Sequence, residues 1–470
     1  MADLLTPDLC VIGAGSGGLS VAAGAVQMGA SVVLIEKHKM GGDCLNYGCV
    51  PSKALLAAAH HAQAHREGTA FGITPVEPQI DYARAMDHVA ETIAHIAPVD
   101  AVDRFVGLGC TVIEDEARFT GPRVVEAGGK TIRARRFVIA TGSQALVPPI
   151  EGLSHVPFFT NETLFENRTR PDHLLIIGGG PIGLEMAQAH RRLGASVTVI
   201  EAATALSKDD PECARIVVER LRAEGVAIHE GAGVTKVSGS DGAITVHTED
   251  GLFEGSHLLV AVGRKPNVEG LGLDKAGVDF SPRGIAVDAG LRTSNRKIYA
   301  IGDVAGGPQF THVAGYHAGL VIRSALFRLP ARVKAGAIPW ASYTDPELAH
   351  VGLTEQAARE AGQAPRVLRW PLAENDRAQA ERIRHGLVKV VLDPKGRILG
   401  CSIVGPHAGD LIQPWILAIS QGLKIGAFAG MVVPYPTLGE AGKRAAGSYY
   451  VPSIFSLLVR RVVRLLARLG

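Results

Sequence analysis

The chain has 470 residues, of which 47% are hydrophobic, and a formal net charge of +2 at pH 7. This length predicts about three domains, and the balanced charge gives no reason to expect a nucleic-acid partner. Six cysteines in 470 residues are too few for a disulfide scaffold. The N-terminus lacks a basic region and a cleavage site, and no apolar run reaches the ~18–20 residues that span a bilayer. We therefore expect a cytoplasmic protein in a reducing compartment.

The first elements predict a dinucleotide-binding unit. Residues 9–12 form a short apolar strand, residues 17–28 a helix rich in small side chains, and residues 31–35 a strand that leads to Glu36. The turn after the first strand matches G-x-G-x-x-G at Gly13, Gly15 and Gly18. Glycine lets the backbone approach a pyrophosphate at a helix N-terminus, and an acidic residue after the second strand can accept ribose hydroxyls. The alternative is a tight turn with no ligand.

The same pattern repeats further along the chain, with Gly178, Gly180 and Gly183 in the turn and Glu201 after the next strand. An internal repeat of this unit predicts two bound dinucleotides. No arginine follows Glu201 closely, and its carboxylate would repel a 2′-phosphate. The second site is therefore expected to favour NAD(H) over NADP(H).

Two more short strands end in glycine turns, one at Thr141 and Gly142 and the other just before Asp303. Each can be a simple strand end, but together they suggest that segments on both sides of the second repeat return to one nucleotide domain. From about Ala335 the pattern changes to antiparallel strands in "PWASYTDPELAHVGLTE" and "GLVKVVLDPKGRILGCSIVG", and a buried helix in "LIQPWILAISQG". This part is predicted to be a separate α+β domain.

Two cysteines, Cys44 and Cys49, lie in "GGDCLNYGCVPSK" just ahead of a predicted helix. A zinc half-site would need further soft ligands at regular spacing, and a structural disulfide does not suit a reducing compartment. Inert buried thiols are a third alternative. The helix N-terminus and Lys53 would lower the thiolate pKa of Cys49. These features favour a redox-active pair, with one thiol toward solvent and the other facing inward.

The two fingerprints, the cysteine motif, "ATGS", "VGRKPN" and "YAIGDV" together resemble the pyridine nucleotide–disulfide oxidoreductases, a family that includes dihydrolipoamide dehydrogenase, glutathione reductase and mercuric reductase. The resemblance implies an α/β fold with two doubly wound dinucleotide-binding domains and a C-terminal α+β dimerisation domain, assembled as a homodimer. The implied divisions are an FAD-binding domain in two parts (1–150 and 271–335), an inserted NAD-binding domain (151–270), a dimerisation domain (336–452) and a basic amphipathic helix (453–470).

The resemblance also implies roles for single residues. Cys49 would be the charge-transfer thiol against the flavin, Cys44 the thiol that attacks the substrate, and Lys53 would lie near the flavin N5 and pair with Glu185. Electrons would pass between NADH, FAD and the Cys44–Cys49 disulfide to a thiol, disulfide or thiol-bound metal acceptor, or in the reverse direction. The residues expected to bind FAD or NAD are Gly13, Gly15, Gly18, Glu36, Lys53, Thr141, Gly142, Asp303, Gly178, Gly180, Gly183, Glu201 and Gly263.

The chain departs from the family near its C-terminus. Members that act on lipoamide or glutathione carry H-P-T-x-x-E, in which the His moves a proton across the dimer interface, but here Tyr435 replaces the His while Glu440 is kept. A Tyr pKa of ~10 against ~6.5 for His makes the phenol a poor proton shuttle at neutral pH. Losing such help typically costs ~10²–10⁴-fold in rate. Mercuric reductase also has a Tyr here, but it ends in a cysteine pair, whereas no cysteine follows Cys401. Members of the family usually have a gating Tyr beside the flavin, and in this chain Pro181 replaces it.

The last residues predict a basic amphipathic helix that either lies on an anionic membrane or packs on the dimer. Its apolar stripe and its arginine face consist of Leu458, Val462, Leu465, Leu466 and Leu469, and of Arg460, Arg461, Arg464 and Arg468. Three functions remain open from the sequence. They are a disulfide or metal reductase, a flavin-level NADH oxidase or quinone reductase that does not need the cysteines, and a redox subunit bound to a complex or membrane.

Overall fold

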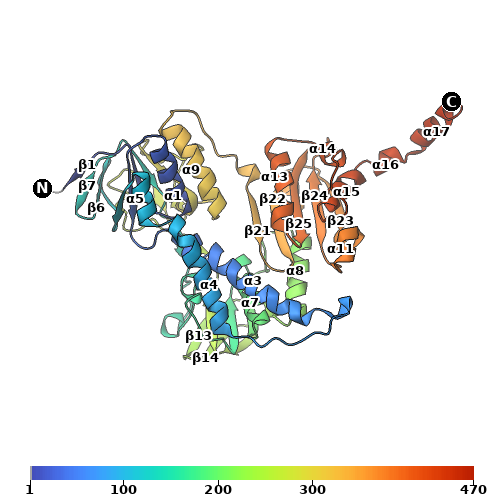
Figure 1. Cartoon of the computed structure of the whole chain (residues 1–470), viewed down its shortest axis with the longest axis horizontal. Coiled ribbons are helices and arrows are strands. Elements are labelled where there is room, and N and C mark those ends of the chain that lie inside the picture. The colour runs from blue at the N-terminus through green and yellow to red at the C-terminus, as the bar shows by residue number, and fades with distance from the viewer. Residues whose placement is uncertain (1–2, 470) are drawn as a thin grey trace. The chain divides into compact units, whose positions relative to one another are not determined.

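The computed structural model describes residues 3–469, which divide into two compact units (Figure 1). Unit 1 contains the chain up to Glu67, Pro75–Ala202 and His229–Val333. Unit 2 contains Gly68–Thr74, Ala203–Ile228 and the chain from Lys334 onward. The division into five segments given above stays a prediction.

Unit 1 contains a parallel five-stranded sheet in the order β20-β8-β2-β3-β4. Its central strand β2 (Leu9–Ile12) pairs with β3 (Val32–Glu36) on one side and with β8 (Arg136–Ile139) on the other. β20 (Ile298–Ala300) pairs with β8, and β4 (Thr111–Glu114) pairs with β3. Segments from both sides of the second repeat therefore join one sheet, as the sequence predicted.

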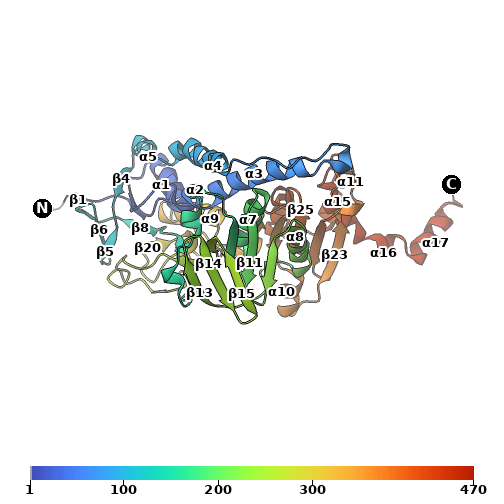
Figure 2. The same ribbon diagram turned by 90° about the horizontal axis from the view of Figure 1, so that it is seen from below.

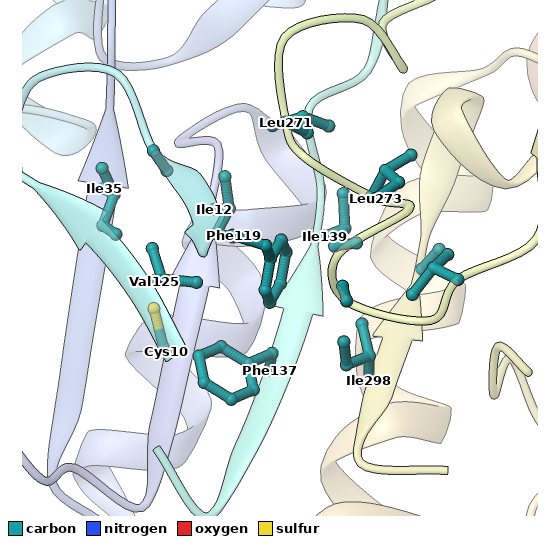
Figure 3. Packing of buried hydrophobic residues seen from close by; sticks show 14 of the residues in the cluster. Cys10, Ile12, Ile35, Phe119, Val125, Phe137, Ile139, Leu271, Leu273 and Ile298 are labelled. Atoms are coloured by element: carbon teal, nitrogen blue, oxygen red, sulfur yellow. The ribbon is translucent and has the colours of Figure 1, made fainter. Parts of the chain in front are cut away.

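Side chains of this sheet alternate between two cores, because successive residues of a strand point to opposite faces. One core contains Cys10, Ile12, Ile35 and Phe137, with the Phe119 ring 5.4 Å from that of Phe137 (Figure 3). The other core contains Leu9, Val11 and Leu34 and packs under α1 (Ser16–Gln27) and α9 (Thr311–Ala325). Burial on both faces explains why these strands read as continuous apolar runs.

The second glycine repeat forms its own sheet, in the order β12-β11-β10-β16, in which β12 is Ala227–Glu230. β10 (His173–Ile177) pairs in parallel with β11 (Ser196–Glu201) and with β16 (His257–Val260), and α7 (Pro181–Arg192) follows β10. The antiparallel strands β13 (Val234–Ser240), β14 (Ala243–Thr248) and β15 (Gly251–Gly255) form a neighbouring sheet (Figure 2). The two repeats thus build the same strand–helix–strand unit, and the α/β prediction is confirmed.

The remaining elements of unit 1 support these two sheets. Helix α3 (Cys49–Arg66) packs against α4 (Tyr82–Ile96) and α7. A small sheet has the order β1-β7-β6-β5, with β1 at Leu4–Leu5, β7 at Lys130–Ile132, β6 at Val124–Ala127 and β5 at Arg118–Gly121. β9 (Ser143–Ala145) pairs with β17 (Arg264–Pro266), which brings two distant loops together beside the first sheet.

Unit 2 is built on an antiparallel sheet in the order β21-β22-β25-β24-β23. The strands are β21 (Pro339–Ser342), β22 (Glu347–Gly352), β25 (Ile398–Gly405), β24 (Leu387–Leu392) and β23 (Arg366–Pro371). The predicted antiparallel strands are confirmed. The helix predicted to be buried, α13 (Gln413–Ser420), is buried on one face only: Trp415 stacks on Phe428 at 3.7 Å, while Leu417 is 63% exposed.

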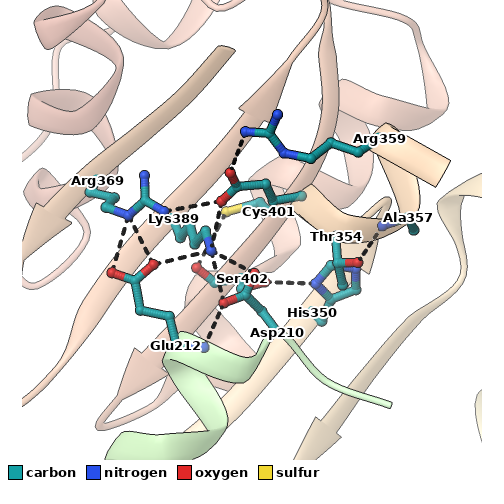
Figure 4. Close-up of polar contacts among 11 residues, drawn as sticks. Asp210, Glu212, His350, Thr354, Ala357, Arg359, Arg369, Lys389, Cys401 and Ser402 are labelled. Carbon is teal, nitrogen blue, oxygen red and sulfur yellow. Dashed lines mark hydrogen bonds and ion pairs between the residues drawn. The ribbon is translucent and has the colours of Figure 1, made fainter. Parts of the chain in front are cut away.

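A buried lysine joins α8 (Pro211–Ala223) to this sheet (Figure 4). The Lys389 Nζ atom on β24 lies 2.8 Å from Asp210 Oδ2, 3.1 Å from Glu212 Oε2 and 3.1 Å from Glu355 Oε2. The Arg369 guanidinium pairs with the same two glutamates. A buried charge is tolerated only when it is paired, so this network fixes α8 within unit 2.

The C-terminal segment consists of α15 (Glu440–Ser448), α16 (Val451–Ile454) and α17 (Leu457–Leu466), labelled in Figure 1. The single helix predicted over 453–470 is therefore divided, because Ser456 caps α17 by accepting from the Val459 N–H. Gly470 lies outside the described residues. Within residues 3–469 we find no helix with the length and apolar character that crossing a membrane requires.

Candidate active site

The two glycine turns have matching geometry that fits a pyrophosphate. A Cβ added at Gly15 would come no closer than 3.9 Å to another atom outside its neighbourhood, and one at Gly180 would meet nothing within 4 Å. The backbone at the start of α1 and α7 is therefore open. In contrast, a Cβ at Gly18 would lie 1.8 Å from Gly13 O, and one at Gly183 would lie 2.0 Å from Gly178 O. These glycines permit the close helix–strand packing of a dinucleotide site.

Each turn is accompanied by the acidic residue that the sequence predicted. Glu36 ends β3, and its Oε2 atom accepts from the Ala14 N–H at 2.6 Å while Oε1 accepts from the His38 N–H at 2.8 Å. Glu201 ends β11, and its Oε2 atom accepts from the Gly179 N–H at 2.6 Å. Both carboxylates are held beside their glycine turns, where this motif binds a ribose. The residues present fit FAD at the first turn and NAD at the second.

The other predicted FAD residues converge at the ends of β8 and β20. Thr141 Oγ1 donates to Asn267 O at 2.8 Å, and Asn267 Nδ2 donates back to Thr141 O at 2.9 Å. The backbone is left-handed at Gly142, with φ of 66°. Asp303 accepts from Ser143 Oγ at 2.5 Å, and burial raises the pKa of its carboxyl. Gly263, which immediately precedes β17, lies in the same region, since the Leu146 N–H donates to its carbonyl at 3.0 Å.

The cysteine pair lies where α2 (Gly42–Asn46) meets α3. Both are free thiols; Cys44 is half-buried and Cys49 is exposed. Cys49 is the first residue of α3, and its Sγ atom lies 3.4 Å from Thr311 Oγ1 at the start of α9. One turn later, Lys53 Nζ lies 2.8 Å from Glu185 Oε2, whose side chain is only 6% exposed. The pairing implied by the resemblance is thus present.

The pKa values of the two thiols are shifted in opposite directions. A hydrogen bond from Cys44 lowers the pKa of Cys49 to about 6; burial opposes this shift, whereas Thr311 and the Lys53 charge add to it. The pKa of Cys44 is raised, first because it donates its hydrogen to Cys49 and then by burial. At neutral pH the pair therefore holds one thiolate at Cys49 and one thiol at Cys44. A polarised pair of this kind is typical of catalytic cysteines.

The predicted acid–base residues lie in unit 2. Tyr435 is 67% exposed, and its hydroxyl donates to Asp376 Oδ2 at 2.9 Å. This bond and the negative charge of Asp376 raise the pKa of the phenol. The Glu440 Oε1 atom lies 2.8 Å from the Arg444 guanidinium, so the Glu440 carboxylate forms an ion pair within α15. Tyr435 is therefore not set up here as a proton donor at neutral pH.

Four residues in or around residues 42–49, which we call the cysteine loop, were missed from the sequence. Asp43 immediately precedes Cys44, so its position in the motif could have identified it. Thr311 and Asn161 are 262 and 118 residues from their partners Cys49 and Asp43, and no local pattern marks them. Arg264 lies in the "VGRKPN" motif beside Gly263, and its guanidinium reaches Asp43 at 2.9 Å.

Comparison with known proteins assigns the family. The pattern described as "Pyridine nucleotide-disulphide oxidoreductase" matches residues 7–318, and the dimerisation domain of that family matches residues 338–446. Mercuric reductase from Streptomyces lividans is 36% identical over 461 residues, covering 94% of this chain and 96% of that protein. Dihydrolipoyl dehydrogenase from Haloferax volcanii is 34% identical over 467 residues, covering 96% and 98%.

A solved structure shows the same fold. The Cu(II) complex of the HOCl-induced flavoprotein disulfide reductase RclA from Escherichia coli has a TM-score of 0.84 and 29% identity, and the match covers 93% of this chain and 98% of that chain. The glycine turns, the cysteine pair and the dimerisation domain agree with these similarities. The chain therefore belongs to the pyridine nucleotide-disulphide oxidoreductase family and is an FAD-dependent oxidoreductase that uses NAD(P)H.

Proposed function

We propose that the protein takes electrons from NADH through FAD to the Cys44–Cys49 pair and delivers them to an acceptor other than a simple dithiol or its disulfide. A metal ion carried by small thiols is the acceptor that fits best. One observation carries this proposal: residue 435 is an exposed Tyr whose hydroxyl donates a hydrogen bond to Asp376. The thiolate ligands of a metal ion can leave as anions and take protons from solvent, so reduction of such an acceptor does not depend on a proton from residue 435.

The residues divide the work in a consistent way. FAD, when bound, supplies the chemistry that accepts a hydride from NADH and passes on two electrons. Thr311 and Lys53 stabilise the Cys49 thiolate, and Glu185 holds Lys53 in place. Cys44 remains the thiol that meets the acceptor. The names of two similar proteins, a mercuric reductase and a Cu(II) complex of a flavoprotein reductase, support a metal acceptor.

An acceptor comparison tests the proposal directly. Anaerobic NADH oxidation would be measured with Hg(II) added as a glutathione complex, with Cu(II) added as a histidine complex because thiols themselves reduce Cu(II), and with lipoamide and glutathione disulfide. We expect the metal complexes to be reduced faster than either disulfide. Faster turnover of lipoamide than of both metal complexes would contradict the choice of acceptor, and would place the protein with the lipoyl dehydrogenases instead.

Two other functions make different predictions. A flavin-level NADH oxidase or quinone reductase gains some support from Pro181, which begins α7 where the family has its gating Tyr, and from Ile182, which is 38% exposed beside it. In that case turnover would survive the loss of Cys44. A complex-bound redox subunit would instead co-purify with an acyl-carrier or membrane protein. The intact, polarised cysteine pair favours the first function over both.

We expect NADH to be preferred over NADPH because of Glu201. The Glu201→Gln variant keeps an oxygen that can accept from the Gly179 N–H but loses the charge that repels a 2′-phosphate. It should raise the ratio of kcat/KM for NADPH to that for NADH by about 10-fold, the equivalent of ~1.4 kcal/mol. Steady-state kinetics with both nucleotides would measure this ratio. Glu254→Gln, on the exposed surface of β15, is the matched control and should leave the ratio unchanged.

We further propose that the protein is a homodimer and that α17 attaches it to the inner face of an anionic membrane. At about 100° per residue, Arg460, Arg461 and Arg464 fall within about 100° of the helix circumference. The apolar residues of α17 other than Leu457 occupy the facing arc of about 160°. Representative members are well exposed, with Leu458 at 71% and Leu465 at 59%. A helix of 10 residues is about 15 Å long, which suits an orientation in the membrane plane.

Charge complementarity makes lipid the favoured occupant of this surface. From Ala441 to the C-terminus the chain has six basic residues and no acidic one. Basic residues near an anionic surface contribute about 1 kcal/mol each. A second copy of the chain would present the same positive charge, which disfavours it as the occupant.

Vesicle co-sedimentation of the full-length holoenzyme tests the membrane contact. Binding to phosphatidylglycerol vesicles should exceed binding to phosphatidylcholine vesicles and should fall with salt. Replacing Arg460, Arg461 and Arg464 by Gln should weaken binding by about 5-fold per residue. Lys395→Gln, in the turn between β24 and β25, is the control for a general loss of charge. Vesicle binding that is unchanged in the triple variant, or a variant dimer that dissociates in light scattering, would show instead that α17 packs on protein.

A further inference from the structure

An arginine lies between two carboxylates at the base of the cysteine loop. The Arg264 Nη2 atom lies 2.9 Å from Asp43 Oδ1, and the Arg264 Nε atom lies 3.9 Å from Asp303 Oδ2. Arg264 also donates through Nε to Ser143 Oγ at 2.8 Å and through Nη2 to Ser143 O at 3.0 Å. Its side chain is only 12% exposed. One buried cation therefore connects the cysteine loop to the strand ends that carry Asp303.

Asp43 is part of the loop that joins the two thiols. It immediately precedes Cys44, and its Oδ2 atom lies so near Gly48 that a Cβ there would come within 2.8 Å of it. The Tyr47 N–H donates to the Asp43 carbonyl at 2.8 Å. The Asp43 side chain thus spans the loop from the residue before Cys44 to the residue before Cys49.

A second side chain holds the loop from the same side. Asn161, which is 7% exposed at the start of α6 (Asn161–Leu164), donates through Nδ2 to Asp43 Oδ1 at 3.1 Å and to Tyr47 O at 3.2 Å. Asn161 is a neutral donor and cannot balance the Asp43 charge. Only a cation does so, and the planar fork of Arg264 can bind Asp43 and Ser143 together in a fixed geometry.

We propose that Arg264 is a positioning residue of the redox site. Its ion pair with Asp43 fixes residues 42–49 in the geometry in which Cys44 reaches both Cys49 and the acceptor. Arg264 acts through Asp43 and touches neither thiol in this arrangement. The inference rests on the proposed redox function of the cysteine pair but not on the identity of the acceptor. It concerns only the half-reaction in which the Cys44 thiol and the Cys49 thiolate form a disulfide, two electrons pass to the acceptor, and the Cys44 proton leaves to solvent or to the reduced acceptor.

The geometry predicts which step depends on Arg264. A misplacement of about 1 Å at a reacting centre can cost on the order of 10²-fold in rate. Loosening the loop should slow the thiol-dependent half-reaction, whereas reduction of the flavin by NADH should continue, since it uses the nucleotide turns. A residue needed only for folding or FAD binding would slow both half-reactions together and lower the FAD content.

Stopped-flow kinetics on the full-length holoenzyme separate the two half-reactions. In Arg264→Leu, we expect flavin reduction by NADH to stay within about 2-fold of the wild type, and reoxidation by glutathione disulfide or a Hg(II)–glutathione complex to slow by 10-fold or more. Arg264→Lys should recover part of this loss, because it restores the charge without the fork. Hydrogen exchange in the peptide covering residues 42–49 should be faster in Arg264→Leu. Lys265→Met, which changes the neighbouring cation of β17 that pairs with Glu269, is the matched control.

A double-mutant cycle between Asp43→Asn and Arg264→Leu tests whether the two residues act as a pair. The double variant should be no slower than Arg264→Leu alone, because Arg264→Leu already removes the ion pair with Asp43. If the two losses multiply, or if both half-reactions slow in parallel, the proposal is wrong. Should Arg264→Leu fail to fold or to hold FAD, Asp43→Asn alone must show the same selective loss. If turnover survives the Cys44→Ser substitution, the proposed function itself is wrong.

Discussion

Replacing Cys44 by serine is expected to lower NADH-dependent reduction of disulfide and metal–thiol acceptors on the order of 10³-fold. The reason is that the pair is polarised: the Cys49 thiolate is stabilised by Thr311 and Lys53, and Cys44, which keeps its proton, is the thiol that we propose to meet the acceptor. Serine preserves the size and hydrogen bonding of Cys44 but cannot form a disulfide. FAD content and the rate of flavin reduction by NADH should remain close to those of the wild type.

Anaerobic stopped-flow reduction by NADH, followed by mixing with each acceptor, would measure both steps in one experiment. Cys110→Ala, which removes a buried thiol outside the site, controls for a general effect of cysteine loss. A Cys44→Ser enzyme that still consumes NADH rapidly with quinones or oxygen, and shows no loss with its best acceptor, would establish the flavin-level alternative. The proposed path through the cysteines would then be wrong.

The sequence predicted the parts of the site that depend on local chain geometry. The glycine turns at Gly13 and Gly178 require residues without a Cβ, and Glu36 and Glu201 follow at the ends of the next strands, so each unit is encoded within about 30 residues. The return of β8 and β20 to the first sheet was also predicted, because two apolar strands that end in glycine turns suit a parallel sheet buried on both faces, although each turn alone could have been a simple strand end.

The contacts between distant segments could not be predicted in this way. Thr311 lies beside Cys49, and Arg264 beside Asp43, only because helix α9 and strand β17 begin near the cysteine loop. The position of α8 in unit 2 has the same origin, since it depends on Lys389 on β24 pairing with Asp210 and Glu212 at the start of α8, and with Glu355 of α10 (Glu355–Glu360). The division of the C-terminal helix at Ser456 was missed for a different reason: a serine cap competes with helix continuation, and periodicity does not report it.

Dihydrolipoamide is expected to reduce the wild-type flavin slowly, and Tyr435→His is expected to accelerate this step on the order of 10-fold. Tyr435 donates a hydrogen bond to Asp376, and the negative charge there raises the pKa of the phenol, so it does not exchange protons at pH 7–8. Imidazole, with an ordinary pKa of ~6.5, can do so. Tyr435→Phe is the matched control. If the phenol takes no part in dithiol chemistry, the Phe variant should be as slow as the wild type.

The gain from histidine alone should be limited by Glu440. In H-P-T-x-x-E the Glu orients the His, but here Glu440 Oε1 lies 2.8 Å from the Arg444 guanidinium. Tyr435→His combined with Arg444→Met frees that carboxylate and should bring the acceleration to about 10²-fold. Arg444→Met alone should have no effect on this step. A wild-type enzyme already reduced rapidly by dihydrolipoamide would instead show that another group donates and accepts the proton, and Tyr435→His would then add nothing.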